Sequence, residues 1–129
     1  MPSEGSRAKR HKISDVVRQI TSCSPHELIG EIKQRLQETP FCAVLDSNNV
    51  VLGLLEGNAW GVDDNTRAED IMSLAPITFR PNRAIHEAKE YFSKHGLETS
   101  LVTNPDGKLV GMAFRSDIEK LASKDERAA

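Results

Sequence analysis

The feature that most limits what this chain can fold into is an internal repeat. Two blocks of similar pattern occupy residues 13–60 and 68–122 of the 129-residue sequence. At matched spacings, Ile29 corresponds to Ile85, Val44 to Val102 and Gly53 to Gly111. One repeat of this size cannot bury its apolar face alone, so stacked copies are expected to share a core. We therefore expect two half-domains, joined by a linker at 61–67 and flanked by a flexible basic tail at 1–12 and a flexible polar tail at 123–129.

Each block is expected to form a short helix, a strand, a helix, two strands and a final helix. Short first strands are expected at 20–23 and 76–79. In the first block, Ser24 and Glu27 form a capping-box pattern, which predicts that the main helix begins there and continues through Leu36. In the second block, apolar residues at 85, 88 and 92 predict a helix that ends at Gly96.

Turn residues separate the later strands of each block. Asp106-Gly107 lies between apolar runs and is a strong hairpin signal. Asp46–Asn49 occupies the same place in the first block, and asparagine tolerates a positive φ angle. Thr66 and Glu69 form a second capping-box pattern, which predicts the start of the next short helix.

Composition excludes several classes of protein. The net charge of −2 argues against a nucleic-acid binder that works by neutralising phosphates, and no apolar run approaches the roughly 18 residues that span a bilayer. The cysteines, Cys23 and Cys42, are not in a Cys-x-x-Cys spacing, so we expect buried thiols in a cytoplasmic protein. The four histidines are scattered, so no metal site is expected, and no catalytic set is recognisable.

The order of motifs in the second block resembles a CBS domain from end to end. The matching runs are Glu69–Met72, Pro76–Thr78, Asp106–Gly111 and Arg115–Ile118. The first block resembles one more weakly. The resemblance implies an α/β (α+β) fold, in which two β-α-β-β-α repeats pack about a pseudo-two-fold axis. It also implies a tandem pair that forms a homodimer, regulates a partner protein and is not an enzyme.

The same resemblance suggests a binding site for an adenosine-type ligand, such as AMP, ATP or S-adenosylmethionine, in a cleft between the repeats. Asp117 would accept hydrogen bonds from the ribose hydroxyls, and Ser116, next to Arg115, would contact a phosphate. Thr21 and Phe41 in the first repeat would flank the adenine. Asp117 has an alternative role, because an acidic residue in a first helical turn stabilises the helix by about 0.3–1 kcal/mol.

Two departures from the family pattern limit the class of ligand that we expect. Phe114 stands where the family has a hydroxyl residue, which weakens phosphate binding. In the first repeat, Glu56 brings a negative charge, Gly57 weakens the helix and Ala59 replaces the aspartate. We therefore expect at most one site per chain, for a ligand with little or no phosphate charge. A ligand-free interaction or dimerisation module is the alternative.

Overall fold

The computed structural model describes residues 11–74 and 77–128 and has a mixed α/β fold with two three-stranded sheets. The expected fold class is confirmed. The described residues form two compact units, which we name after their sheets. The β1–β3 unit contains residues 19–74, 77 and 103–109, and the β4–β6 unit contains residues 11–18, 78–102 and 110–128. Arg7, Lys9 and Arg10 of the basic tail lie outside the described residues.

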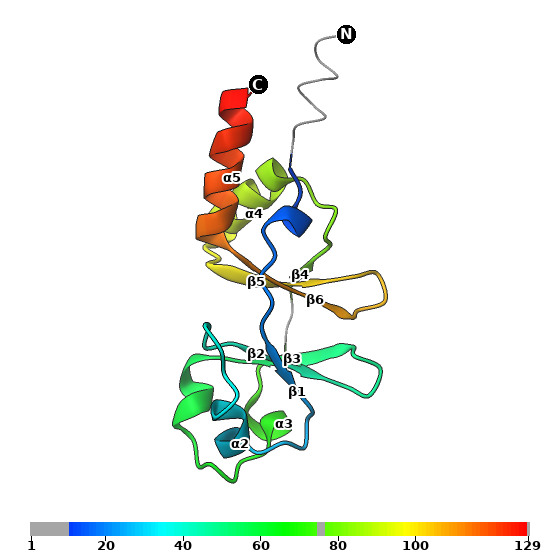
Figure 1. Cartoon of the computed structure of the whole chain (residues 1–129), viewed down its shortest axis with the longest axis vertical. Coiled ribbons are helices and arrows are strands. Elements are labelled where there is room, and N and C mark those ends of the chain that lie inside the picture. Colours follow the sequence, from blue (N-terminus) through cyan, green and yellow to red (C-terminus); the bar gives the residue numbers. More distant parts are fainter. Residues whose placement is uncertain (1–10, 75–76, 129) are drawn as a thin grey trace. The chain divides into compact units, whose positions relative to one another are not determined.

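The β1–β3 unit has its sheet in the order β1-β2-β3, with β1 parallel and β3 antiparallel to β2. Its core holds Ile29, Ile32, Val44, Leu55 and Ala68, all fully buried. Its elements, labelled in part in Figure 1, are β1 (Thr21–Cys23), α2 (Ile29–Lys33), β2 (Cys42–Leu45), β3 (Val51–Leu55), the 3-10 helix η2 (Gly57–Gly61) and α3 (Ala68–Ile71).

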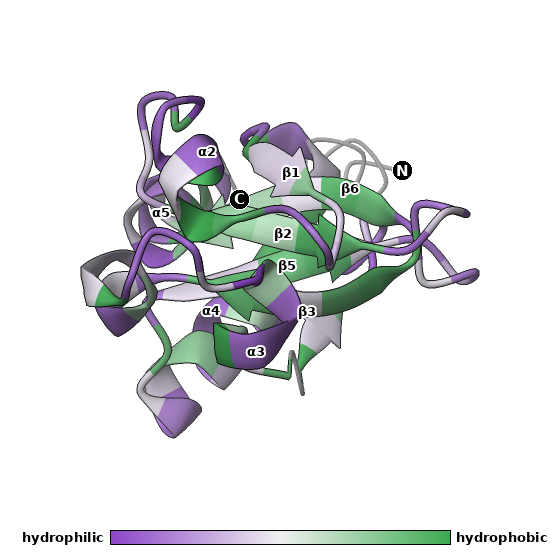
Figure 2. Ribbon diagram, turned by 90° about the horizontal axis from the view of Figure 1, so that it is seen from below, coloured by the Kyte–Doolittle hydropathy of each residue, from purple (hydrophilic) through white to green (hydrophobic). Residues whose placement is uncertain are grey.

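The β4–β6 unit has β5 between β4 and β6, and α4 packs against α5 (Figure 1). Figure 2 shows that hydrophobic residues gather on the strands, including β5 and β6. Fully buried Ile13, Ile85, Phe92 and Ile118 belong to its core. Its elements are the 3-10 helix η1 (Ile13–Asp15), β4 (Thr78–Phe79), α4 (Ile85–His95), β5 (Thr99–Thr103), β6 (Leu109–Phe114) and α5 (Arg115–Ala128).

Each unit takes its short first helix from the beginning of the other repeat. η1 precedes β1 in the sequence but packs in the β4–β6 unit, where Ile13 N–H donates to the Arg83 carbonyl at 2.9 Å. α3 precedes β4 but packs in the β1–β3 unit, where Ala68 N–H donates to the Glu27 carbonyl at 2.9 Å. The compact units therefore cut across the repeat boundaries predicted from the sequence.

The matched glycines explain how these exchanged segments are held. Arg18 and Met112 exchange two backbone hydrogen bonds of 2.9 Å, directly after Gly111. A Cβ atom on Gly111 would lie 2.3 Å from Cγ1 of Val17 and 2.6 Å from the Arg18 carbonyl oxygen. Gly53 is equivalent in the β1–β3 unit, where the next residue, Leu54, exchanges hydrogen bonds with Ser73. Both glycines permit a close backbone approach that a side chain would block.

Two sequence predictions about helix starts are wrong. α2 begins at Ile29 rather than near Ser24, because Leu28 is extended and bridges to Arg67. The Glu27 carboxylate accepts the Ser24 N–H at 2.7 Å, which closes a turn but caps no helix. α3 has Arg67 as its N-cap, with no side-chain capping bond, so Thr66 does not act as predicted.

Other predictions at the level of elements are confirmed. α4 ends at Gly96, whose φ of 64° is left-handed, and the hairpin turns place Asn49 at 67° and Gly107 at 82°.

The C-terminal residues differ from the expected polar tail, because α5 continues through residues 123–128. Asp125 accepts the His11 N–H at 2.7 Å, and Lys89 pairs with Glu126, so both hold this last part of the helix. Among the described helices, none has the length and apolar character needed to cross a bilayer.

Candidate functional site

Asp117 lies in the first turn of α5 and forms a bidentate ion pair with Arg18. Arg18 Nε donates to Oδ2 at 2.7 Å, and Nη2 donates to Oδ1 at 2.9 Å. Both carboxylate oxygens therefore have a charged donor. The Asp117 side chain is 20% exposed and that of Arg18 is 50% exposed, so the pair lies at the surface of the β4–β6 unit.

Phe114 supports the same arginine from another side. The guanidinium carbon of Arg18 lies 4.9 Å from the centroid of the Phe114 ring, within cation–π range. Phe114 is the last residue of β6, three positions before Asp117. The aromatic residue that replaces the family's hydroxyl thus contributes a face on which Arg18 rests, and it offers no hydrogen bond to a phosphate.

A groove of about 710 Å³ opens beside Asp117, entirely within the β4–β6 unit. One wall is the segment Asp15–Arg18, which begins at the last residue of η1, and the other is formed by α5. Val16, Val17 and Leu121 give it apolar surface. Its volume is within the range of about 300–1,000 Å³ usual for small-molecule sites. Its remaining lining residues are Lys120, Ser123, Lys124 and Arg127.

Two other predicted site residues lie next to Asp117 in sequence but do not line the groove. Arg115 Nε donates to the Glu119 carboxylate at 2.9 Å, and its Nη1 lies 3.5 Å from that of Glu98. The pKa of Arg115 is raised mainly by the hydrogen bond to Glu119. Ser116 is exposed. The Arg115 guanidinium thus already pairs with two carboxylates of its own unit.

The remaining predicted residues, Thr21 and Phe41, belong to the β1–β3 unit. Thr21 begins β1, and its hydroxyl oxygen is buried without a hydrogen-bond partner among residues 11–74 and 77–128. A buried hydroxyl that lacks a partner is unusual and calls for an explanation. Phe41 directly precedes β2 and is half-buried. The predicted cleft between the repeats stays a prediction.

The matching segment of the first repeat is built differently. Gly57–Gly61 forms the 3-10 helix η2, where the second repeat has the 14-residue helix α5. Ala59 is buried and carries no carboxylate. A smaller pocket of about 390 Å³ lies here, with Glu56 as its one ionisable lining residue. These features favour the expectation that this second site is degraded.

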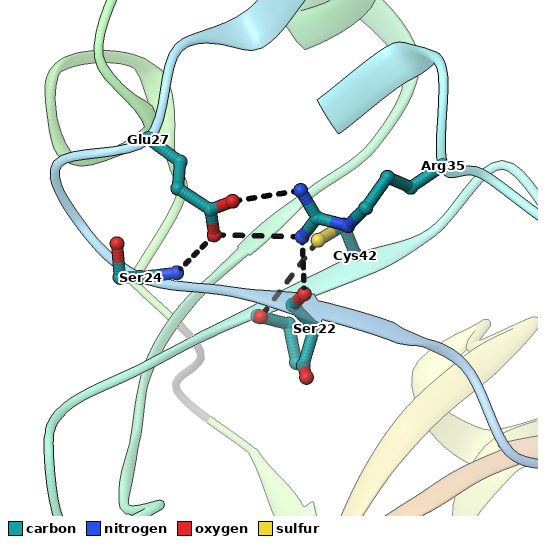
Figure 3. A network of polar contacts seen from close by, with 6 residues as sticks. Ser22, Ser24, Glu27, Arg35 and Cys42 are labelled. Carbon is teal, nitrogen blue, oxygen red and sulfur yellow. Dashed lines mark hydrogen bonds and ion pairs between the residues drawn. The ribbon is translucent and has the colours of Figure 1, made fainter. Parts of the chain in front are cut away.

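A polar network joins the turn before α2 to the residues after it (Figure 3). Arg35 donates to the Glu27 carboxylate at 2.7 Å and to the Ser22 carbonyl at 2.8 Å. Burial alone would raise the pKa of Glu27, but the Ser24 N–H and Arg35 outweigh it and lower that pKa. The network ties Ser22, Glu27 and Arg35 together across the irregular chain around α2, so we assign it a structural role.

The two cysteines lie close together on β1 and β2 beside this network, and both thiols are buried and free. A hydrogen bond from Cys42 lowers the pKa of Cys23, and the same bond, with burial, raises the pKa of Cys42. Within the described residues, no three His, Cys, Asp or Glu side chains gather in a way that could hold a metal ion.

Comparison with known proteins agrees with this architecture. The model of the CBS domain family matches residues 68–124, which include β4–β6 and most of α5. No curated protein sequence matches the chain significantly. The CBS domains of a transcriptional regulator from Streptococcus pneumoniae are similar in structure, with a TM-score of 0.73 and 14% identity. The match covers 84% of this chain and 97% of that one.

Two further similar structures were solved with nucleotides. CBSX2 in complex with AMP has a TM-score of 0.73 and 15% identity, over 91% of this chain and 99% of that one. The cytosolic domain of the Mg²⁺ channel MgtE in complex with ATP has a TM-score of 0.69 and 18% identity. That match covers 78% of this chain and only 44% of the MgtE domain. At these identities, the similarity establishes the fold alone.

Proposed function

This chain is a CBS-domain protein with the fold of a CBS pair, and from that premise we propose that it is a non-catalytic module that binds an adenosine-type ligand. The observation that carries the proposal is the groove of about 710 Å³ with Asp117 at its edge. A carboxylate there can accept hydrogen bonds from both ribose hydroxyls. Val16 and Val17 supply the apolar surface that a sugar or base edge can cover.

A ribose would compete with Arg18 at Asp117. Arg18 already donates to both carboxylate oxygens, and each oxygen has a further lone pair that a ribose hydroxyl could use. Arg18 is half-exposed, and an ion pair of that exposure contributes about 0–1 kcal/mol, which a ligand can outweigh. The ligand class comprises AMP, ATP and S-adenosylmethionine, and the AMP and ATP complexes of similar folds support that choice.

For Thr21 and Phe41, which belong to the β1–β3 unit, we propose contact with an adenine on the family resemblance. The hydroxyl of Thr21 needs a partner, and a ligand atom would supply one. Phe41 offers a half-buried ring against which an adenine could pack. A homodimer and a regulated partner protein, on the family resemblance, and a cytoplasmic location, on the two free cysteines, complete the proposal.

Replacing Asp117 tests the ribose contact. In Asp117→Asn the side chain keeps its shape but loses its charge, and we expect adenosine and AMP to bind about 1.5–3 kcal/mol more weakly, as for a charge-assisted hydrogen bond. Isothermal titration calorimetry on the full chain measures this loss. Asp70→Asn is the matched control, because Asp70 is an exposed acid in the first turn of α3.

The same titrations separate the candidate functions. If Asp117→Asn and Asp70→Asn both change only stability, Asp117 merely supports its helix and the ribose assignment fails. A chain that binds no adenine compound, yet forms a stable dimer in light scattering, is instead a ligand-free interaction module. The occupied state of Asp117 favours that second candidate, since the carboxylate needs no ligand to be satisfied.

A further inference from the structure

We propose that Cys23 and Cys42 form a redox modification site, at which hydrogen peroxide oxidises the pair to a reversible disulfide bond. They are the only cysteines of the chain, and both are free and belong to the core of the β1–β3 unit. Neither is a residue of the proposed ligand site. The inference therefore does not depend on the proposed function.

The sheet brings the two thiols to the same face. β1 runs parallel to β2, and Thr21 is the register partner of Cys42. Register partners lie on one face of a sheet, and successive side chains of a strand alternate between faces, so Cys23 lies on the same face as both. The cysteines are thus diagonal neighbours on adjacent strands, and their thiols are close enough to share a hydrogen bond.

The surroundings of the pair favour the thiolate that reacts with a peroxide. The hydrogen bond from Cys42 and the positive charge of Arg35 together lower the pKa of Cys23, although burial and the charge of Glu27 oppose them. Arg35 is held in place because it donates to the carbonyl of Ser22, the residue before Cys23, at 2.8 Å. Figure 3 shows its guanidinium beside the Cys42 sulfur.

The two cysteines differ in a way that assigns the order of the steps. Cys23 is 6% exposed and Cys42 is fully buried, and the hydrogen bond to Cys23 and burial raise the pKa of Cys42. The Cys23 thiolate therefore attacks one peroxide oxygen and becomes a sulfenic acid, while the O–O bond breaks and the released hydroxide takes up the proton that Cys23 lost. The Cys42 sulfur then attacks the Cys23 sulfur, and its proton leaves with the sulfenic hydroxyl as water. Two thiols and one peroxide thus give one disulfide and two water molecules.

Closing the bridge requires a small movement of β1. Strands about 4.8 Å apart, with a rise of about 3.3 Å per residue, place diagonal Cα atoms about 8 Å apart, whereas a disulfide needs less than about 7 Å. β1 must therefore slide by about 1–2 Å along β2. It has three residues and is an edge strand of its sheet, so little else has to move with it. A bridge that strains the backbone is more easily reduced, as a reversible modification requires.

This movement gives the oxidation a structural consequence. Thr21 begins the same strand, and its buried hydroxyl lacks a partner among residues 11–74 and 77–128. A slide of β1 displaces that hydroxyl relative to β2. The redox state of the pair therefore changes the conformation at the start of the sheet.

The test oxidises the full chain and identifies the thiols that are lost. Reduced protein is treated with hydrogen peroxide, quenched with catalase, alkylated with iodoacetamide in guanidinium chloride and digested with trypsin without a reductant. Mass spectrometry should find peptide 19–33 linked to peptide 36–67, with both thiols lost together. Dithiothreitol should restore both thiols, and a non-reducing denaturing gel should show the linked protein as a single chain.

Two variants separate the roles of the cysteines. In Cys42→Ala, Cys23 has no partner thiol, so it should accumulate as a sulfenic acid that dimedone captures. In Cys23→Ala, Cys42 should react about tenfold more slowly than Cys23 does in Cys42→Ala, because it is fully buried and burial disfavours its thiolate. Equal reactivity of the two cysteines would overturn the order of the steps.

Replacing Arg35 tests the activation of Cys23. In Arg35→Gln, with Cys42→Ala as background, the pH at which dimedone capture is half-maximal should rise, because the charge that lowers the pKa of Cys23 is gone. Arg115→Gln is the control, since Arg115 also pairs with carboxylates but belongs to the β4–β6 unit. An equal shift in both variants, or none in Arg35→Gln, would remove Arg35 from the mechanism.

Amide NMR spectra show whether the bridge forms in the folded protein. Oxidation should shift the signals of residues 21–23 and 42–45 and leave those of the β4–β6 unit in place. The inference is overturned if both thiols stay open to alkylation under conditions that oxidise glutathione in the same sample, or if links join only different chains. It is also overturned if oxidation collapses the whole spectrum, because the bridge then forms in the unfolded chain.

Discussion

At the scale of single residues, Arg18 decides whether Asp117 is available. Removing the guanidinium in Arg18→Ala frees both carboxylate oxygens, so adenosine no longer competes with it for them. An exposed ion pair contributes about 0–1 kcal/mol, so we expect adenosine affinity to rise by up to about fivefold. Calorimetric titration of the variant with adenosine measures the change.

Arg83→Ala is a closely matched control for this substitution. Arg83 also pairs with a carboxylate, that of Glu87, and lies 5.5 Å from the centroid of an aromatic ring, that of Phe79. It does not line the groove, so its loss should leave adenosine binding unchanged. A fall in adenosine affinity on Arg18→Ala would show that Arg18 contacts the ligand and does not compete with it.

Residue patterns predicted only part of the candidate site. Asp117 was predictable because its motif lies within one stretch of sequence, and acidic residues favour a first helical turn. Its partner Arg18 is 99 residues away, so no local pattern joins them. Lys120 and Lys124 were visible in the sequence, but only the position of the segment after η1 shows that a groove lies beside them.

At the scale of elements, the crossing at Gly111 ties the segment after η1 to β6. In Gly111→Ala the new methyl group would meet Val17 and the Arg18 backbone, and backbone atoms cannot move aside cheaply. Overpacking of this kind costs about 1–3 kcal/mol of stability. Urea denaturation should show that loss, and adenosine should also bind more weakly because the segment forms one wall of the groove.

Gly61→Ala is the control for the glycine substitution. Apart from the local backbone of Gly61, no atom of the described residues lies within 4 Å of a Cβ built there, so the methyl group fits without displacement. Its free energy of unfolding should stay within about 0.5 kcal/mol of wild type, as for most surface substitutions. If Gly111→Ala were equally mild, the close crossing would not constrain the fold.

Elements that depend on nearby residues were predictable, and those that depend on distant ones were not. The end of α4 at Gly96 and the turn at Gly107 follow from the conformational freedom of glycine. The start of α2 does not follow from its capping pattern, because Leu28 pairs with Arg67 from the next repeat. The pairing keeps Leu28 extended and delays the helix to Ile29.

At the scale of the whole molecule, the exchange of first helices makes each unit dependent on both repeats. The core of the β4–β6 unit includes Ile13, which is fully buried and comes from before the first strand. The core of the β1–β3 unit includes Ala68, which comes from after the linker. The compact units of the structure therefore do not coincide with the repeats visible in the sequence.

This exchange predicts that neither repeat folds alone. Fragments 1–60 and 61–129 each lack a core segment of the unit that they mostly form. Losing a buried side chain such as Ile13 costs about 2–5 kcal/mol, a large part of the 5–15 kcal/mol typical of a small protein. We expect each fragment to show poorly dispersed amide NMR signals, and an equimolar mixture to recover the spectrum of the intact chain. A fragment 61–129 that unfolds cooperatively on its own would mean that η1 covers that core without being needed to form it.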